Sequence, residues 1–211
     1  MPEVQIITDN DVRYGVWQNV ESDDFFLNNL KLYNLEQQEV AALKARKKSE
    51  WLCSRYLLDQ VTDHRLSGAC LKDTFGKPYI DGSQDFISIS HTFDFTAVIV
   101  SRKVCGIDLQ VMVPKILTIG PRYISDREMT FIPENNKLHY YHVIWGAKEA
   151  MYKCYGTKEL DFKNQLVIHD FYYFHDGFYF NGEIIKGSFK TKYKLFCKQI
   201  DQMILVYATE K

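Results

Sequence analysis

Three polar side chains in the second half of the sequence have the chemistry of a metal site. Asp108 and Gln110 lie two residues apart in the run GIDLQ, so a strand there would point both toward one face. Glu149 lies in the run WGAKEAMYK, whose spacing is helical, and we expect it to come from the other half of the molecule. Magnesium takes oxygen ligands and needs only one or two carboxylates. Asp108 and Glu149 satisfy that minimum, whereas the Gln110 amide is a weaker ligand and suits a metal-bound water.

Each candidate residue also has an ordinary structural explanation. A lone GID sequence more often places an acid at a strand edge. Glu149 and Lys153 are four residues apart, and an exposed pair at this spacing stabilises a helix by only about 0.5 kcal/mol. His91 closes a strand-like run, SISHT, where a single histidine is more often a core residue than a ligand. Lys77, in the turn GKPY, is suited to bind a terminal phosphate. Without the motif, the interpretation as an exposed turn lysine is equally well supported.

Four short motifs are more specific together than any of them alone. They are GKPY at 76–79, SISHT at 88–92, GIDLQ at 106–110 and WGAKEAMYK at 145–153. This set resembles the 4'-phosphopantetheinyl transferase superfamily, in particular its larger single-chain type that activates peptide synthetases. The segments RYISDRE and SEWLCSRYLL extend the resemblance over nearly the whole chain. Two positions depart from the family pattern, because Thr92 replaces a serine and Gln110 stands where the family usually has glutamate.

The resemblance implies a magnesium-dependent enzyme of the holo-acyl-carrier-protein synthase type. Such an enzyme transfers the 4'-phosphopantetheine arm of coenzyme A to a serine of an apo acyl or peptidyl carrier protein, and it releases 3',5'-adenosine bisphosphate. By the same resemblance, Asp108 and Glu149 bind the metal, Gln110 joins them through a water, and Lys153 meets phosphate. Glu149 is then the candidate to accept the serine proton. Lys148, which a helix rotates away from both, is expected at phosphate or at the carrier.

The resemblance also places coenzyme A contacts in the first half of the chain. His91 would contact the phosphates, and Ser90 would present its hydroxyl or backbone N–H to the same anion. Lys77 would hold a terminal phosphate. Arg46 and Arg55, in a basic helix, would lie near the nucleotide 3'-phosphate, with Lys47 and Lys48 as weaker candidates. We expect Trp145 and Tyr152 to pack the WxxKE helix against the strands.

The pattern along the chain predicts an α+β protein. Helical spacing runs from Ser22 to about Val61, and three strands near 86–90, 96–101 and 104–111 indicate an antiparallel meander. The strongest helical pattern ends at Gly156, and hairpin-like strands follow it. Helices followed by strands occur twice, so we predict two similar α+β halves, 1–103 and 104–211, in a pseudo-twofold arrangement with antiparallel sheets and the ligand cleft between them.

Composition excludes several other classes of protein. The 26 basic and 27 acidic residues balance, so no overall field attracts nucleic acid or an anionic membrane, although the basic helix and the run FYYFHDGFYF raise a nucleic-acid-binding alternative. No stretch is long enough for a membrane span, and we expect a cytoplasmic monomer. The five cysteines are widely spaced and are predicted to be buried thiols. A non-catalytic coenzyme A or carrier-protein binding module derived from this fold is the main alternative, because Gln110 departs from the metal-site pattern.

Overall fold

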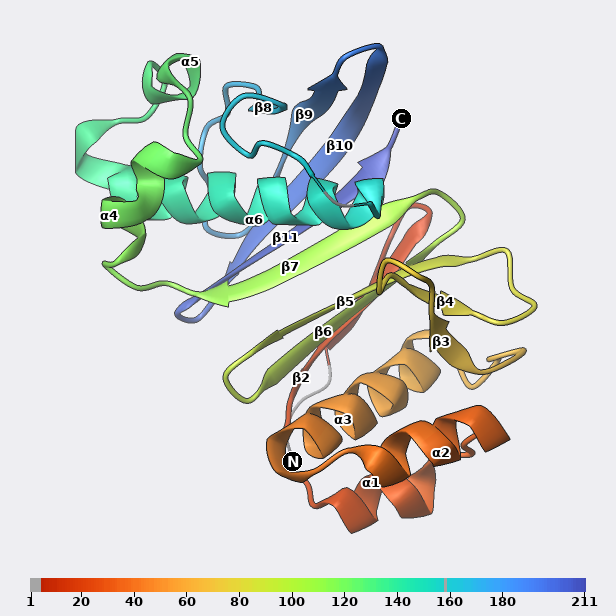
Figure 1. Cartoon of the computed structure of the whole chain (residues 1–211). Coiled ribbons are helices and arrows are strands. Elements are labelled where there is room, and N and C mark those ends of the chain that lie inside the picture. The colour runs from red at the N-terminus through yellow and green to blue at the C-terminus, as the bar shows by residue number, and fades with distance from the viewer. Residues whose placement is uncertain (1–4, 158) are drawn as a thin grey trace. The chain divides into compact units, whose positions relative to one another are not determined.

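The computed structural model describes residues 5–157 and 159–211, and the chain divides into two compact units, Met1–Val104 and Cys105–Lys211. Each unit combines helices with one antiparallel sheet (Figure 1). The prediction of an α+β protein with an antiparallel sheet in each of two halves is confirmed.

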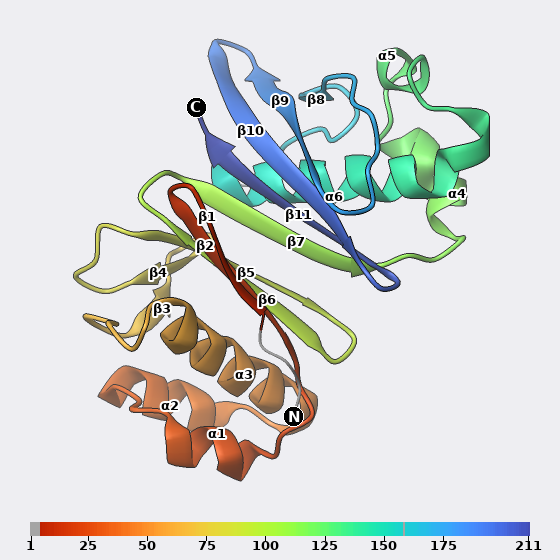
Figure 2. The ribbon, with the colours of Figure 1, turned by 180° about the vertical axis from the view of Figure 1, so that it is seen from behind.

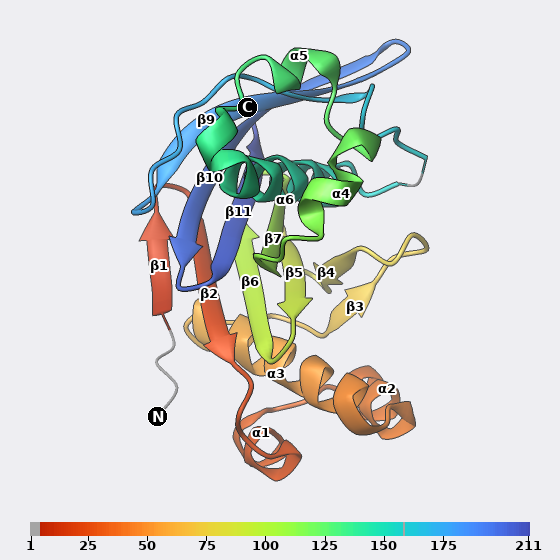
Figure 3. The same ribbon diagram turned by 90° about the vertical axis from the view of Figure 1, so that its left-hand side faces the viewer.

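The first unit is a six-stranded sheet in the order β1-β2-β6-β5-β4-β3, with α3 packed on β6 and β2. Figure 3 shows the strands β1, β2, β6 and β5 side by side in this order. The strands are β1 (Gln5–Asp9), β2 (Val12–Gln18), β3 (Cys70–Lys72), β4 (Pro78–Ile80), β5 (Phe86–Thr92) and β6 (Phe95–Ser101); the helices are α1 (Asp23–Asn29), α2 (Asn34–Ala42) and α3 (Ala45–Val61).

The predicted helical stretch from Ser22 to Val61 forms three helices. Its first turn is capped as expected, since the backbone N–H of Phe25 donates to the Ser22 hydroxyl at 3.3 Å. The chain then leaves the helical conformation at Leu30 and at Leu43, both of which have extended backbone angles. These breaks let α1 and α3 both pack their apolar residues into one core, in which Phe26 is fully buried.

The second unit is a five-stranded sheet in the order β7-β11-β10-β9-β8, and α6 lies across β7 and β11 on one face. Figure 2 shows this sheet from the side that α6 does not cover. The strands are β7 (Cys105–Val111), β8 (Leu166–Ile168), β9 (Phe178–Lys186), β10 (Phe189–Ile200) and β11 (Met203–Glu210); the helices are α4 (Ile116–Ile119), α5 (Asp126–Met129) and α6 (Lys137–Tyr155), with short 3-10 turns at Gly120–Arg122 and Glu134–Asn136.

Strand β7 does not continue the meander that the sequence predicts. Strands β5 and β6 pair with each other in the first sheet, whereas β7 pairs with β11, with Asp108 opposite Val206. The turn at Ser101–Val104 therefore carries the chain from one sheet to the other. Strand spacing in the sequence could not reveal this change, because register depends on the partner's apolar face and not on proximity along the chain.

The five cysteines are all free and buried, as the sequence predicts. Burial raises the pKa of the Cys53 thiol to about 12 and that of the Cys70 thiol to about 11. Their thiolates are therefore not populated at neutral pH, and these side chains act as small core residues.

Candidate functional site

Two glycines allow strand β7 to approach helix α6 closely. A Cβ built on Gly106 would lie 2.0 Å from the carbonyl oxygen of Ala150, and one built on Gly146 would lie 2.9 Å from the amide nitrogen of Gln110. Real Cβ atoms do not approach other atoms so closely, so a side chain at Gly106 would push the helix off the strand. The polar residues of β7 and α6 therefore share a narrow, partly buried space.

Asp108 and Lys153 form an ion pair across this space. The Lys153 ammonium lies 3.2 Å from Asp108 Oδ1 and donates to the backbone carbonyl of Ile107 at 2.6 Å. The Asp108 residue is only 8% exposed, so its carboxylate is held away from bulk water. Lys153 on α6 therefore lies against the strand that carries Asp108, and its expected contact with phosphate stays a prediction.

Glu149 shares the electrostatic environment of Asp108. Burial and, to a smaller extent, the negative charge of Asp108 raise the pKa of Glu149 from 4.5 to about 7, against the opposing effect of the Lys153 ammonium. The expectation that Glu149 comes from the other half is wrong, because Asp108 on β7 and Glu149 on α6 both belong to the unit Cys105–Lys211. The two carboxylates repel each other in a partly buried place. A divalent cation bound to both would neutralise their charges.

Among residues 5–157 and 159–211 there is no group of three or more His, Cys, Asp or Glu side chains placed to hold a metal. The side chains available here as oxygen ligands for a metal are the two carboxylates of Asp108 and Glu149. That set meets the minimum for magnesium bound together with waters and phosphate oxygens, and it does not form a complete protein cage of the kind that calcium or zinc uses.

The Gln110 side chain is held by three hydrogen bonds. Its amide nitrogen donates to Asp108 Oδ2 at 3.2 Å and to the backbone carbonyl of His142 at 3.1 Å. Its amide oxygen lies 2.8 Å from Nδ1 of His142. The nitrogen therefore faces Asp108, and the oxygen that would be the metal ligand faces the histidine.

His142 is a residue of this cluster that the sequence analysis missed. It is 1% exposed, and burial lowers its pKa, so the neutral imidazole is favoured. Its ring contacts Gln110 through Nδ1 and the backbone of Val113 through Nε2. The available signal was helical spacing, since His142 and Glu149 are seven residues, or two turns, apart on α6 and so lie on one face.

Lys148 has a structural role, which contradicts the expectation that it reaches phosphate or the carrier. Its side chain is fully buried, and its ammonium donates to Glu128 Oε2 at 2.8 Å and to the carbonyls of Tyr123 and Phe162 at 2.6 and 2.8 Å. Glu128 also accepts from the backbone N–H of Ile168. The pair therefore joins the α5 segment and two loops to α6, and Lys148 is not accessible to a ligand.

Trp145 and Tyr152 pack around the same helix. Trp145 makes an edge contact with Tyr123, and both Trp145 and Tyr152 lie against the ring of Phe162. They fix α6 mainly against loop residues rather than strands, so the predicted packing role holds with different partners.

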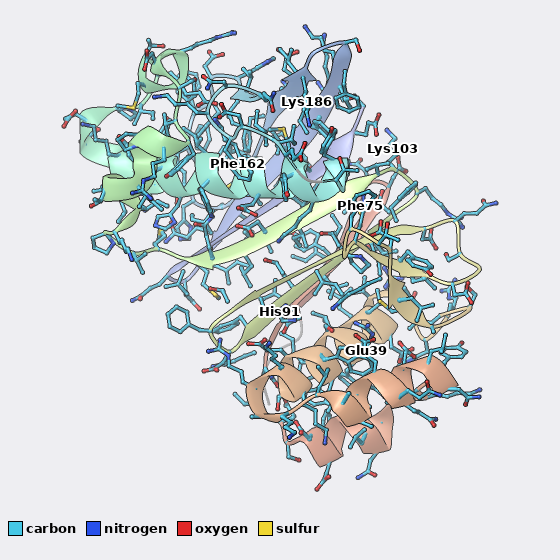
Figure 4. All side chains as sticks on the ribbon, in the orientation of Figure 1. Glu39, Phe75, His91, Lys103, Phe162 and Lys186 are labelled. Atoms are coloured by element: carbon cyan, nitrogen blue, oxygen red, sulfur yellow. The ribbon has the colours of Figure 1, made fainter. Side chains whose placement is uncertain are left out.

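The first unit contains a cavity of about 510 Å³ that several predicted coenzyme A residues line. His91, Lys47 and Arg55 contribute to its wall, as do Gly76 and Pro78, which flank Lys77. The remaining lining residues are Glu39, Leu43, Glu50, Trp51, Ser54, Lys72 and Ile89. His91 and Glu39 are labelled in Figure 4. The wall of this cavity carries the cations Lys47, Arg55 and Lys72 against the carboxylates Glu39 and Glu50, so its balance of charge favours an anionic ligand by one charge.

The turn that carries Lys77 is built by Asp73. One oxygen of the Asp73 carboxylate accepts from the backbone N–H groups of Phe75 and Lys77, both at 2.8 Å. Gly76 between them has φ +87°, which favours glycine. The GKP sequence therefore specifies a turn of defined shape, which positions the Lys77 backbone beside the cavity.

The other predicted phosphate ligands differ in how available they are. Arg46 is exposed and forms an ion pair with Glu50 at 2.6 Å. Arg55 is buried, donates to Glu36 and to the Cys70 carbonyl, and lies 4.3 Å from the centre of the Trp51 ring. Its guanidinium thus already links α2, α3 and β3.

Ser90 and the remaining lysines of the basic helix complete the list of predicted ligands. Ser90 is 6% exposed on β5, next to the exposed His91. Lys48 pairs with Asp23 at 3.4 Å, whereas Lys47 lines the cavity. Nothing in these positions tests a phosphate role for Ser90, which stays a prediction.

Comparison with known proteins gives one informative match. A segment of 87 residues is 32% identical to a 4'-phosphopantetheinyl transferase of Bacillus subtilis, and the match covers 39% of this chain and 38% of that protein. No family model matches the chain. The match supports the 4'-phosphopantetheinyl transferase superfamily, while the part of the relative that is aligned is well under half its length. None of the helices in the described part of the chain has the length and apolar character that a membrane span requires.

Proposed function

We propose that this chain transfers the 4'-phosphopantetheine moiety of coenzyme A to a serine of an apo carrier protein, as a member of the larger, single-chain type of 4'-phosphopantetheinyl transferase. The observation that carries the proposal is the cluster of Asp108, Glu149 and Lys153 between β7 and α6, within the two motifs that resemble the family. The partial similarity to a transferase of this name also supports it.

In the proposed reaction the serine hydroxyl oxygen attacks the phosphorus that carries the pantetheine arm. The P–O bond of the pyrophosphate breaks, and 3',5'-adenosine bisphosphate leaves with the bridging oxygen. Asp108 and Glu149 would hold Mg²⁺, which when bound supplies charge neutralisation of the pyrophosphate. Lys153, already paired with Asp108, is suited to bind a phosphate oxygen of the substrate.

Glu149 is the proposed acceptor of the serine proton. A general base works best when its pKa is near the operating pH. Burial together with the Asp108 charge raises the pKa of Glu149 to about 7 in the metal-free chain, and bound Mg²⁺ would lower it from there. A carboxyl group with an ordinary pKa would hold the proton too weakly to assist its transfer. The proton would pass from the serine oxygen to a Glu149 oxygen, directly or through a metal-bound water, as the new P–O bond forms.

The coenzyme A nucleotide is proposed to occupy the cavity of the first unit. His91 and Lys47 line this cavity. Lys77 and Ser90, which are next to lining residues in the sequence, would contact the phosphates together with His91, and Arg46 would approach the 3'-phosphate with Lys47 beside it. Arg55 would act on this site through the wall that it forms with Trp51, because its guanidinium is occupied by Glu36 and Cys70. Charge-assisted contacts of this kind are about twice as strong as neutral hydrogen bonds.

The test is to incubate the full chain with coenzyme A, Mg²⁺ and several apo carrier proteins, and to weigh each carrier by mass spectrometry. We expect one carrier to gain one phosphopantetheine, and Asp108→Asn and Glu149→Gln to abolish the gain. Glu134→Gln, a matched change of an exposed glutamate, should leave it intact. The proposal is overturned if no carrier gains mass although calorimetry shows that coenzyme A binds. That outcome would favour the alternative, a non-catalytic coenzyme A or carrier-protein binding module with an incomplete metal site.

A further inference from the structure

The orientation of the Gln110 amide is determined by its neighbours. The atom facing Asp108 lies 3.2 Å from a carboxylate oxygen and 3.1 Å from the backbone carbonyl of His142. Both neighbours are acceptors, so this atom must be the NH₂ group, which has two hydrogens to donate. The opposite assignment would place the amide oxygen against two other oxygens with no hydrogen between them.

The His142 ring fixes the other end of the amide. The Gln110 oxygen can only accept a hydrogen bond, so Nδ1 of His142 carries the hydrogen. Nε2 lies 3.0 Å from the backbone nitrogen and 3.3 Å from the carbonyl oxygen of Val113, and in the neutral ring it carries the lone pair and accepts from the Val113 N–H, the shorter of the two contacts. That Nδ1–H donates to the Gln110 oxygen at 2.8 Å. Val113, His142, Gln110 and Asp108 therefore form a chain of hydrogen bonds in which each donor faces an acceptor.

We infer that His142 is a positioning residue that holds Gln110 as a hydrogen-bond donor to Asp108, so that Gln110 does not supply an oxygen to the metal. This inference rests on the proposed function and departs from the sequence prediction, which placed Gln110 at the metal through a bound water. Both oxygens of Asp108 are anchored, one by Gln110 and the other by Lys153. The carboxylate is thereby held in one orientation before any cation binds, and the site relies on two carboxylates, Asp108 and Glu149.

The hydrogens on His142 Nδ1 and on the Gln110 amide nitrogen can be observed directly. Nuclear magnetic resonance of the full chain with ¹⁵N-labelled histidine and glutamine reports the His142 Nδ1–H and the Gln110 NH₂ group, assigned by their loss in His142→Asn and Gln110→Glu. We expect both signals without Mg²⁺ and their persistence when Mg²⁺ is saturating. Loss of the Nδ1–H signal on adding Mg²⁺, or a hydrogen on Nε2 instead, would overturn the inference, because the Gln110 oxygen would then have turned to the ion.

Variants test whether His142 acts through Gln110. Loss of a side chain that orients a metal ligand commonly weakens metal binding about 10-fold to 100-fold. Calorimetric titration with Mg²⁺ should therefore show a dissociation constant about 10-fold higher for both Gln110→Ala and His142→Leu. The double variant should be no weaker than either single one, because the two substitutions interrupt the same chain of hydrogen bonds.

Two further variants separate positioning from simple packing. His142→Asn should retain most of the Mg²⁺ affinity, since the asparagine N–H can replace Nδ1–H toward the Gln110 oxygen. His139→Leu, the same change one turn earlier on α6 where the ring lies against Tyr173, should leave the affinity unchanged. Multiplicative losses in the double variant, or equal losses in His142→Asn and His142→Leu, would show that His142 does not act through Gln110.

The outcomes distinguish this inference from the proposed function. If the Nδ1–H persists and the losses are not multiplicative while no carrier is modified, the positioning role stands and the transferase proposal fails. If a carrier is modified but Mg²⁺ removes the Nδ1–H signal, the transferase proposal stands and the role assigned to His142 is wrong.

Discussion

Replacing Glu149 by glutamine should remove a pH-dependent loss of stability. Burial, reinforced by the Asp108 charge, raises the pKa of Glu149 from 4.5 to about 7 in the folded chain. Below pH 4.5 the side chain is protonated in both the folded and the unfolded state, so its contribution is fully present. As the pH rises from 4.5 toward 7, the unfolded chain releases this proton while the folded chain retains it, and stability is lost. The difference between the two pKa values corresponds to about 3 kcal/mol of unfolding free energy.

The assay is urea unfolding from pH 4 to pH 9 with a chelator present, so that no divalent cation binds. Relative to Glu149→Gln, the wild type should lose up to about 3 kcal/mol of unfolding free energy between pH 4.5 and 8. Adding Mg²⁺ at pH 8 should return part of this stability to the wild type and none to the variant, because an ion binds the ionised carboxylates. Glu134→Gln, at an exposed position, should follow the wild type.

Parallel unfolding curves for the wild type and Glu149→Gln over this pH range would refute the reasoning. They would mean that Glu149 ionises in the folded chain as easily as in the unfolded chain. The carboxylate would then be solvated and distant from Asp108, and its proposed role as a base of matched pKa would lose its physical support.

Three other perturbations have expected outcomes. Lys148→Met should lower the unfolding free energy by about 3–5 kcal/mol in urea titrations, because it leaves the Glu128 charge buried and unpaired. Adding Glu128→Gln should recover part of that loss, and an effect of Lys148→Met under about 1 kcal/mol would contradict the buried pairing. Gly106→Ala should cost about 1–3 kcal/mol and also weaken Mg²⁺ binding, since the new methyl group displaces α6 from β7; unchanged stability would show that the helix can shift freely. Lys77→Ala and His91→Ala should each raise the calorimetric dissociation constant for coenzyme A about 10-fold, and unchanged affinity would remove both from the phosphate site.

The sequence predicted the elements that depend on local pattern. Helix α6 repeats apolar residues at helical spacing and ends at Gly156, whose φ of +72° is the left-handed cap that glycine permits. The alternation in GIDLQ correctly predicted a strand on which Asp108 and Gln110 share a face, and both contact groups on α6.

Features that depend on distant partners could not be predicted in this way. Lys148 looked available because a helical projection rotates it away from Glu149, but it is buried against Glu128, twenty residues earlier. Arg55 was assigned to phosphate from its helix, yet its partners Glu36 and Cys70 come from α2 and β3. The role of Gln110 depends on an amide orientation that His142 sets, and no spacing rule specifies which end of an amide faces a carboxylate.

The burial of all five native thiols makes this chain convenient for attaching spectroscopic labels. Cys53 and Cys70 have thiol pKa values of about 12 and 11, so maleimide or methanethiosulfonate reagents should leave them unmodified in the folded state. New cysteines at the exposed positions Asn28 and Asp176, one in each compact unit, would then be the reactive pair. Spin labels at these two positions would report the separation of the units in solution, and its change when coenzyme A is added, without first removing any native cysteine.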